Sequence, residues 1–223
     1  MVISSPWSET WVAWTMLGLL ILAAAAYALQ PQALGVAFRT LFTGKDRSSV
    51  FIDTAIDKRV LALNALFAIG TLAMAVYVVF YASLSLPSFL LSNYAWILLL
   101  TTGIVLIRTI VQAFTAFIFF PGNQLETFTS HYYYLTVCTT TVLYPITLLS
   151  LFWDALSPNT ILWLHLAVIV AYLLILLLKC ILILVRSFKG FLFALAYILF
   201  YEVTALAAIG ATAYFILTNN IAL

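Results

Sequence analysis

Residues 161–185 read ILWLHLAVIVAYLLILLLKCILILV, an apolar run in which Lys179 is the one charged residue. An α-helix needs about 20 predominantly apolar residues to cross the hydrocarbon core of a bilayer. The run does not alternate apolar and polar side chains, as the strands of a membrane β-barrel do. It therefore predicts a transmembrane helix rather than a barrel strand.

Runs of the same kind recur along the whole chain. Hydrophobic residues make up 66% of the sequence and charged residues 7%, whereas roughly a quarter of the residues of a soluble domain are charged. So few charged side chains cannot cover a water-exposed surface, and a net charge of +2 is too small to favour a nucleic-acid partner. We expect an all-α, polytopic membrane helical bundle that forms a single transmembrane domain over residues 1–223. Its expected spans are about 11–29, 60–84, 89–120, 132–153, 161–185 and 191–217.

The basic residues are distributed unevenly between the expected loops. Lys and Arg gather between the first two spans and around the end of the fifth, and both terminal segments contain none. The positive-inside rule therefore predicts that both termini lie outside the cytoplasm. Tryptophan prefers the membrane interface, and all six tryptophans lie near ends that this topology places outside: Trp7, Trp11, Trp14, Trp96, Trp153 and Trp163.

The expected first cytoplasmic loop, residues 30–59, is the most hydrophilic part of the chain. Its basic residues Arg39, Lys45 and Arg47 are interleaved with leucines and phenylalanines. We expect a basic amphipathic segment that lies on anionic lipid at the interface, with membrane lipid as the partner. Docking of a cytoplasmic protein is the alternative.

Two charged residues lie inside expected spans, Arg108 in the third and Glu202 in the sixth. A charge near the bilayer centre costs about 2.5 to 3.5 kcal/mol on insertion scales, so such residues usually face the bundle and find a partner. Each residue lies about 18 Å from the cytoplasmic end of its helix, at about 1.5 Å per residue. We therefore expect a direct or water-bridged pair. The alternative ends the third helix at Arg108 and makes residues 109–120 a surface helix.

Small polar residues predict a polar seam beside these charges. Thr101, Gln112 and Thr115 fall within about 40° of the embedded arginine on a helical wheel. Cys138 and Thr141 bound a run of four small polar residues in the fourth span. Close helix packing with hydroxyls bonded to preceding carbonyls is the simpler interpretation of that run. A nucleophile or an ion-binding shell is the alternative.

No pattern in the sequence predicts a metal or cofactor site. The residues around Lys45 lack the glycine spacing of a phosphate-binding loop. His131 and His165 are expected near opposite membrane faces, so they cannot share a metal ion. Cys138 and Cys180 lack the spacing of a redox pair, and we expect them to be free thiols.

Several short motifs resemble a known family. They are Arg186-Ser187-Phe188, Tyr201-Glu202, His131-Tyr132-Tyr133-Tyr134 and Pro145. Over roughly residues 40–216 the chain resembles a family of small multi-pass proteins from Bacteroidota that is catalogued as a domain of unknown function. Val203-Thr204 depart from the aliphatic residues and proline expected there, which concerns the local helix geometry and not the glutamate. The resemblance implies a bacterial inner-membrane location and no established activity.

The sequence favours a non-enzymatic role, as a subunit or scaffold of an envelope assembly that contains other membrane proteins. The expected loops are too short to form a soluble catalytic domain. One alternative is a proton-coupled or small-solute translocator that uses Glu202 and Arg108. A second alternative is an intramembrane lipid-modifying enzyme, although no spacing brings an acid, a base and a nucleophile together.

Overall fold

The structure is a computed structural model. It describes residues 9–32, 35, 37–38, 58–84, 90–119, 123–153, 155–184 and 198–219. Within these ranges, the side chains of residues 112–113, 115–119, 123–131, 180–184, 198–199 and 219 are not described.

The described residues form helices and no strands. The helices are α1 (Thr10–Leu29), α3 (Lys58–Leu84), α4 (Leu91–Phe119), α5 (Asn123–Phe152), α6 (Pro158–Leu184), the π-helix η3 (Ile198–Val203) and α8 (Thr204–Asn219). Six segments among them are long and apolar enough to cross a membrane. The expected fold class is therefore confirmed, and the chain is a multi-pass integral membrane protein.

The helix boundaries decide between the two alternatives for the third span and differ from the expected spans at the start of the fourth. The third span is one continuous helix through Phe119, so α4 does not end at Arg108 as the alternative required. The fourth helix begins at Asn123, ahead of the expected start at residue 132. The residues added there read NQLETFTSH, and they are too polar to belong to an apolar run although they continue the same helix.

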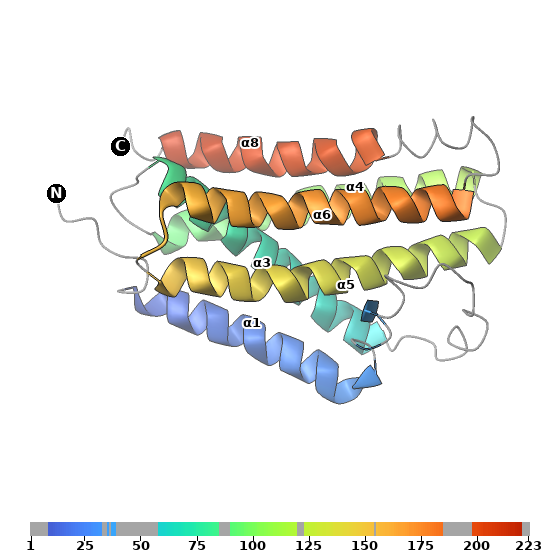
Figure 1. The fold of residues 1–223 in the computed structure, drawn as a ribbon, viewed down its shortest axis with the longest axis horizontal. Helices are drawn as coiled ribbons and strands as arrows, with labels where there is room; N and C mark the ends of the chain where they lie inside the picture. Colours follow the sequence, from blue (N-terminus) through green and yellow to red (C-terminus); the bar gives the residue numbers. More distant parts are fainter. Residues whose placement is uncertain are drawn as a thin grey trace.

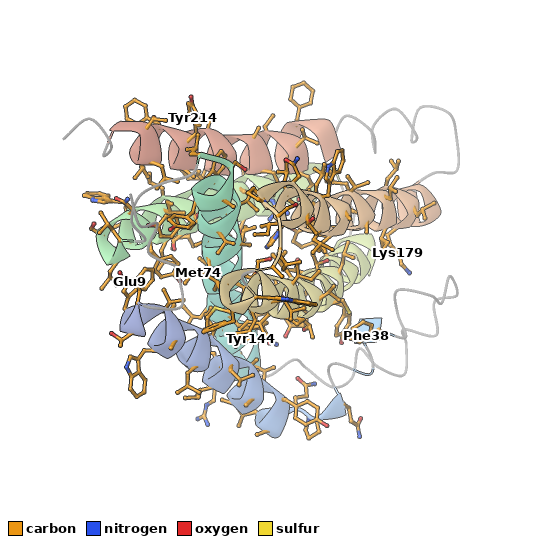
Figure 2. The ribbon with its side chains drawn as sticks, turned by 60° about the vertical axis from the view of Figure 1, so that its left-hand side comes forward. Glu9, Phe38, Met74, Tyr144, Lys179 and Tyr214 are labelled. Atoms are coloured by element: carbon orange, nitrogen blue, oxygen red, sulfur yellow. The ribbon has the colours of Figure 1, made fainter. Side chains whose placement is uncertain are left out.

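Helix α3 is the centre of the bundle. It crosses the other helices diagonally (Figure 1) and packs against α1, α4, α5, α6 and α8. Half of its most apolar segment is buried, against 17% for the corresponding segments of α4 and α6. Met74 of α3 lies inside the bundle with no exposed surface, whereas Tyr214 projects from the outer side of α8 (Figure 2).

The contact between α1 and α3 depends on a glycine. A Cβ atom added at Gly70 would lie 2.5 Å from Leu19 Cδ2, which leaves no room for a side chain in the present packing. Tyr144 of α5 also holds α1, because its hydroxyl donates to the Met16 carbonyl at 2.9 Å. Small residues commonly permit such close helix approach in membranes.

One end of the bundle carries the start of α1, the end of α3, the start of α4 and the end of α8 (Figure 1). Tyr77 of α3 binds the residue before α4, because its hydroxyl donates to the Leu90 carbonyl at 3.1 Å and accepts from the Leu90 amide at 2.8 Å. Trp11 of α1 stacks on Tyr94 of α4, with ring centroids 5.6 Å apart. Among the described residues, the start of α1 and the end of α8 therefore lie at the same end of the bundle.

Candidate functional site

Arg108 of α4 and Glu202 of η3 form a salt bridge inside the bundle, between Arg108 Nη2 and Glu202 Oε1. The Glu202 side chain is 3% exposed and the Arg108 side chain 16% exposed. The structure therefore brings together the two embedded charges, from helices that are far apart in sequence. Burial of both charges is favourable only when further hydrogen bonds satisfy their remaining polar atoms.

Tyr172 of α6 supplies such a hydrogen bond. Its hydroxyl donates to Glu202 Oε2 at 2.9 Å and accepts from Arg108 Nη2 at 3.3 Å. Both carboxylate oxygens of Glu202 are thus occupied by donors from different helices. The tyrosine fixes the carboxylate relative to α6 as well as to α4.

Tyr132 of α5 completes the cluster. The Arg108 guanidinium carbon lies 4.8 Å from the centroid of its ring, in cation–π geometry. Its hydroxyl lies 3.2 Å from the Tyr172 hydroxyl. Because the Tyr172 hydrogen is directed to Glu202, the Tyr132 hydroxyl is the donor between the two tyrosines. Residues from α4, α5, α6 and η3 therefore meet in one hydrogen-bonded cluster.

The backbone around Glu202 departs from a regular α-helix. Residues Ile198–Val203 form a π-helix, which continues directly into α8 at Thr204. Short π-helical segments occur frequently at functional sites, because the extra residue in the turn redirects the side chains around it. Glu202 lies in the last turn of this segment and is directed inward.

A cavity of about 120 Å³ adjoins the cluster. It lies between α3, α4, α5, α6 and the start of α8, and Arg108 and Glu202 contribute to its wall. Most of the other lining residues are aliphatic, including Leu72, Val105 and Ile169. The remaining polar lining comes from the two tyrosines of the cluster and from threonines on α5: Tyr132, Tyr172, Thr136, Thr139 and Thr140.

A family model described as Domain of unknown function (DUF4271) matches residues 12–210. The chain belongs to this family. The match includes all four residues that form the cluster and nearly the whole bundle, and it confirms the expected relation to a domain of unknown function. The chain matches no curated protein and no solved structure.

Among the described side chains, none of the predicted polar seam of this DUF4271 protein lines the cavity. Cys138 is buried but does not line the cavity. Thr141 lines a separate space of about 30 Å³ with Gln30 and Asn64. Thr101 is buried on α4, and the side chains of Gln112 and Thr115 lie outside the described residues.

Sequence reasoning missed Thr136 and included Thr139 and Thr140 only as members of the run from Cys138 to Thr141, although all three threonines line the cavity. The lining face of α5 consists of residues that recur every three or four positions: Tyr132, Thr136, Thr139, Thr140 and Leu143. This periodicity could have separated them from Cys138 and Thr141, which belong to other faces of the same helix. Tyr172 had no comparable signal, because a tyrosine within an apolar span is ordinary in membrane proteins.

The remaining predicted residues do not contribute to the described site. Arg39, Lys45 and Arg47 lie outside the described residues, as does the side chain of His131. His165 is buried between α5 and α6, with Nδ1 2.8 Å from the Ile161 carbonyl oxygen and Nε2 3.3 Å from Thr147 Oγ1. Within the described part of the chain, no three His, Cys, Asp or Glu side chains are grouped as metal ligands.

Proposed function

We propose that this DUF4271 protein is a small-solute translocator of the bacterial inner membrane, and that the cavity beside Arg108 and Glu202 is its solute site. The observation that carries the proposal is the cavity itself, about 120 Å³ in volume and bounded by the buried ion pair. A space of this size holds several water molecules, at about 30 Å³ of liquid volume each.

The depth of the cavity supports this function. Its lining includes residues near the middle of the apolar helical segments, such as Leu72 in α3, Leu143 in α5 and Ile169 in α6, while Arg108 and Glu202 lie nearer the ends of theirs. Solute sites of secondary carriers lie near the bilayer midplane, where interrupted helices meet. The π-helix that carries Glu202 is an interruption of that kind.

A purely structural role does not require a lined pocket of this size. A scaffold or subunit of an envelope assembly, the role that the sequence favours, could pack these helices closely. The pocket therefore supports a binding role.

The ion pair fits a positioning role in this account. Arg108 and Glu202 neutralise each other and connect α4 to the start of α8, while Tyr172 connects both to α6. The pair therefore fixes the positions of these helices around the cavity without giving the site a net charge. The outer surface of the bundle is apolar, as Ile110, Phe114 and Phe200 illustrate, and this surface suits surrounding lipid.

Cysteine accessibility tests whether solutes reach the cavity. In a background where Cys138 and Cys180 are replaced by alanine, Ala205→Cys places a thiol in the cavity wall. Ala213→Cys is the matched control, because Ala213 is buried on the same helix but does not line the cavity. A small hydrophilic methanethiosulfonate should modify Ala205→Cys severalfold faster than Ala213→Cys in reconstituted membranes, because reaction requires access of the reagent to the thiol.

If neither thiol reacted in the folded protein, the translocator proposal would be wrong. The subunit role would then be the better account, and copurification of stoichiometric partners from native membranes would be its test. Fast modification of both thiols would show general loosening of α8 and would also count against a defined site.

A further inference from the structure

The threonines of the cavity show which kind of solute the site recognises. Thr136, Thr139 and Thr140 lie on one face of α5, and all three line the cavity. A threonine hydroxyl has a single hydrogen to donate and two lone pairs with which to accept. The direction of that hydrogen therefore decides whether the threonine offers the cavity a donor or an acceptor.

All three hydrogens are directed into the helix backbone. Thr136 Oγ1 donates to the Tyr132 carbonyl at 3.0 Å, and Thr139 Oγ1 donates to the Leu135 carbonyl at 2.8 Å. Thr140 Oγ1 lies 2.9 Å from the Thr136 carbonyl and 3.1 Å from the Val137 carbonyl. The hydroxyl oxygens consequently present lone pairs, so this wall of the cavity accepts hydrogen bonds.

The ion pair in the cavity wall determines which charge the solute can carry. Arg108 and Glu202 are bound to each other, so the wall has no net charge to compensate an ion. An unpaired charge in a site of low dielectric is strongly disfavoured. The site therefore suits an uncharged molecule.

The rest of the lining and the volume limit the shape of the solute. Aliphatic side chains, among them Val168, Leu206 and Ile209, form the remaining surface. Engineered apolar cavities of about 150 Å³ hold a benzene molecule, so about 120 Å³ suits a compact body of roughly one ring.

We infer that the cavity binds an uncharged, compact and mainly apolar molecule that carries a hydrogen-bond donor, such as a small alcohol or phenol, with the donor directed to the threonine face of α5. This inference rests on the proposed solute site. It goes further, because it names the chemistry that the site selects.

Two isomers allow the effect of the hydrogen-bond donor on binding to be measured apart from the effects of size and hydrophobicity. p-Cresol and anisole have the same atoms, but only p-cresol has a hydroxyl hydrogen. Binding of each is measured by equilibrium dialysis against protein in lipid nanodiscs. In the variant Ala205→Leu the new side chain fills the cavity, so the binding that remains measures partition of the compound into lipid. Ala207→Leu, on the exposed side of α8, is the control for this substitution.

The wild-type protein and Ala207→Leu should bind p-cresol about fivefold more tightly than anisole, the ratio expected for one net hydrogen bond. Thr139→Val and Thr140→Val should each reduce this ratio toward one while anisole binding remains. Thr141→Val should keep the ratio, because Thr141 makes the same bond to a backbone carbonyl at 2.7 Å but does not line this cavity.

The possible results separate this inference from the proposed function. Cavity-dependent binding of both isomers with equal affinity would overturn the donor preference and leave the solute site intact. Binding of neither isomer above the Ala205→Leu background would overturn both. A preference for p-cresol that survives Thr139→Val, Thr140→Val and Thr136→Val would also contradict the inference, because the donor would then be recognised away from the threonine face.

Discussion

At the scale of single residues, the bundle shows how a membrane protein satisfies embedded charge. Glu202 is almost fully buried, yet each of its carboxylate oxygens receives a donor. One donor comes from Arg108 and the other from Tyr172, so the carboxylate is held by two helices besides its own. Removal of either donor leaves a buried acceptor without its partner, and that loss is larger than the net strength of an average hydrogen bond.

Tyr172→Phe removes the donor to Glu202 Oε2 and preserves the ring. We expect the free energy of unfolding to fall by about 1.5 to 3 kcal/mol, the range for a hydrogen bond to a charged group. Titration of the folded protein with a denaturing detergent measures the change. Tyr214→Phe is the control, because this exposed ring lies on the outside of α8, and a loss of equal size there would contradict the assignment.

Thr101→Val should change the free energy of unfolding in the opposite direction, as a gain in stability. Thr101 is 1% exposed, and its Oγ1 has no hydrogen-bond partner among the described residues. Replacement by valine removes a buried polar atom whose desolvation penalty is about 1 to 3 kcal/mol, so the free energy of unfolding should rise. In Thr102→Val, by contrast, a hydroxyl that donates to the Leu98 carbonyl at 2.7 Å is lost, and no gain is expected. A destabilised Thr101→Val variant would indicate that the hydroxyl has a partner.

At the scale of helices, the apolar pattern predicted most of the architecture. A run of about 20 apolar residues is sufficient evidence for a spanning helix, and the run at residues 161–185 became α6 with nearly the same bounds. The polar start of α5 could not be recognised in this way, because hydropathy measures contact with lipid and not helicity. The π-helix at Glu202 was equally hidden, since a single extra residue in a turn has no compositional signal.

Gly70 tests the packing of α1 on α3. Alanine normally stabilises a helix by about 0.8 to 1 kcal/mol relative to glycine, and Gly103→Ala should show a gain of this kind because its added Cβ meets no other atom within 4 Å. Gly70→Ala should show none, since Leu19 must move to make room. Gly70→Leu should destabilise the protein by about 1 to 3 kcal/mol, as overpacking does. The same detergent titration measures all three variants, and equal gains for the two alanine variants would contradict the close approach.

At the scale of the whole molecule, the sequence predicted the pairing of two distant residues but not the site around them. The insertion cost of Arg108 and Glu202 and their similar depth were sufficient to expect contact, and the structure brings them together. The cavity depends on side chains from five helices, and no single-helix pattern contains that information. The helical periodicity shows that Thr136, Thr139 and Thr140 share one face of α5, but only the packed bundle shows that this face lines the cavity.

The orientation in the membrane also belongs to this scale. The basic first loop predicts that both chain ends lie outside the cytoplasm. In intact cells, a cysteine at Ser157, which is exposed between α5 and α6, should react with an impermeant thiol reagent. A cysteine at Ser48 in the basic loop should react only after permeabilisation. The reverse pattern would show that the orientation is inverted.

The most direct measurement of the central claim, that a buried ion pair holds the helices around a mid-membrane cavity, is a double-mutant cycle on that pair. Arg108→Gln and Glu202→Gln should each lower the free energy of unfolding by about 3 to 5 kcal/mol, because each leaves one buried charge without its counterion. The double variant should lose less than the sum of the two, with a coupling energy above about 1 kcal/mol. If the two losses instead add within about 0.5 kcal/mol, the residues are independent and the ion pair does not organise the bundle.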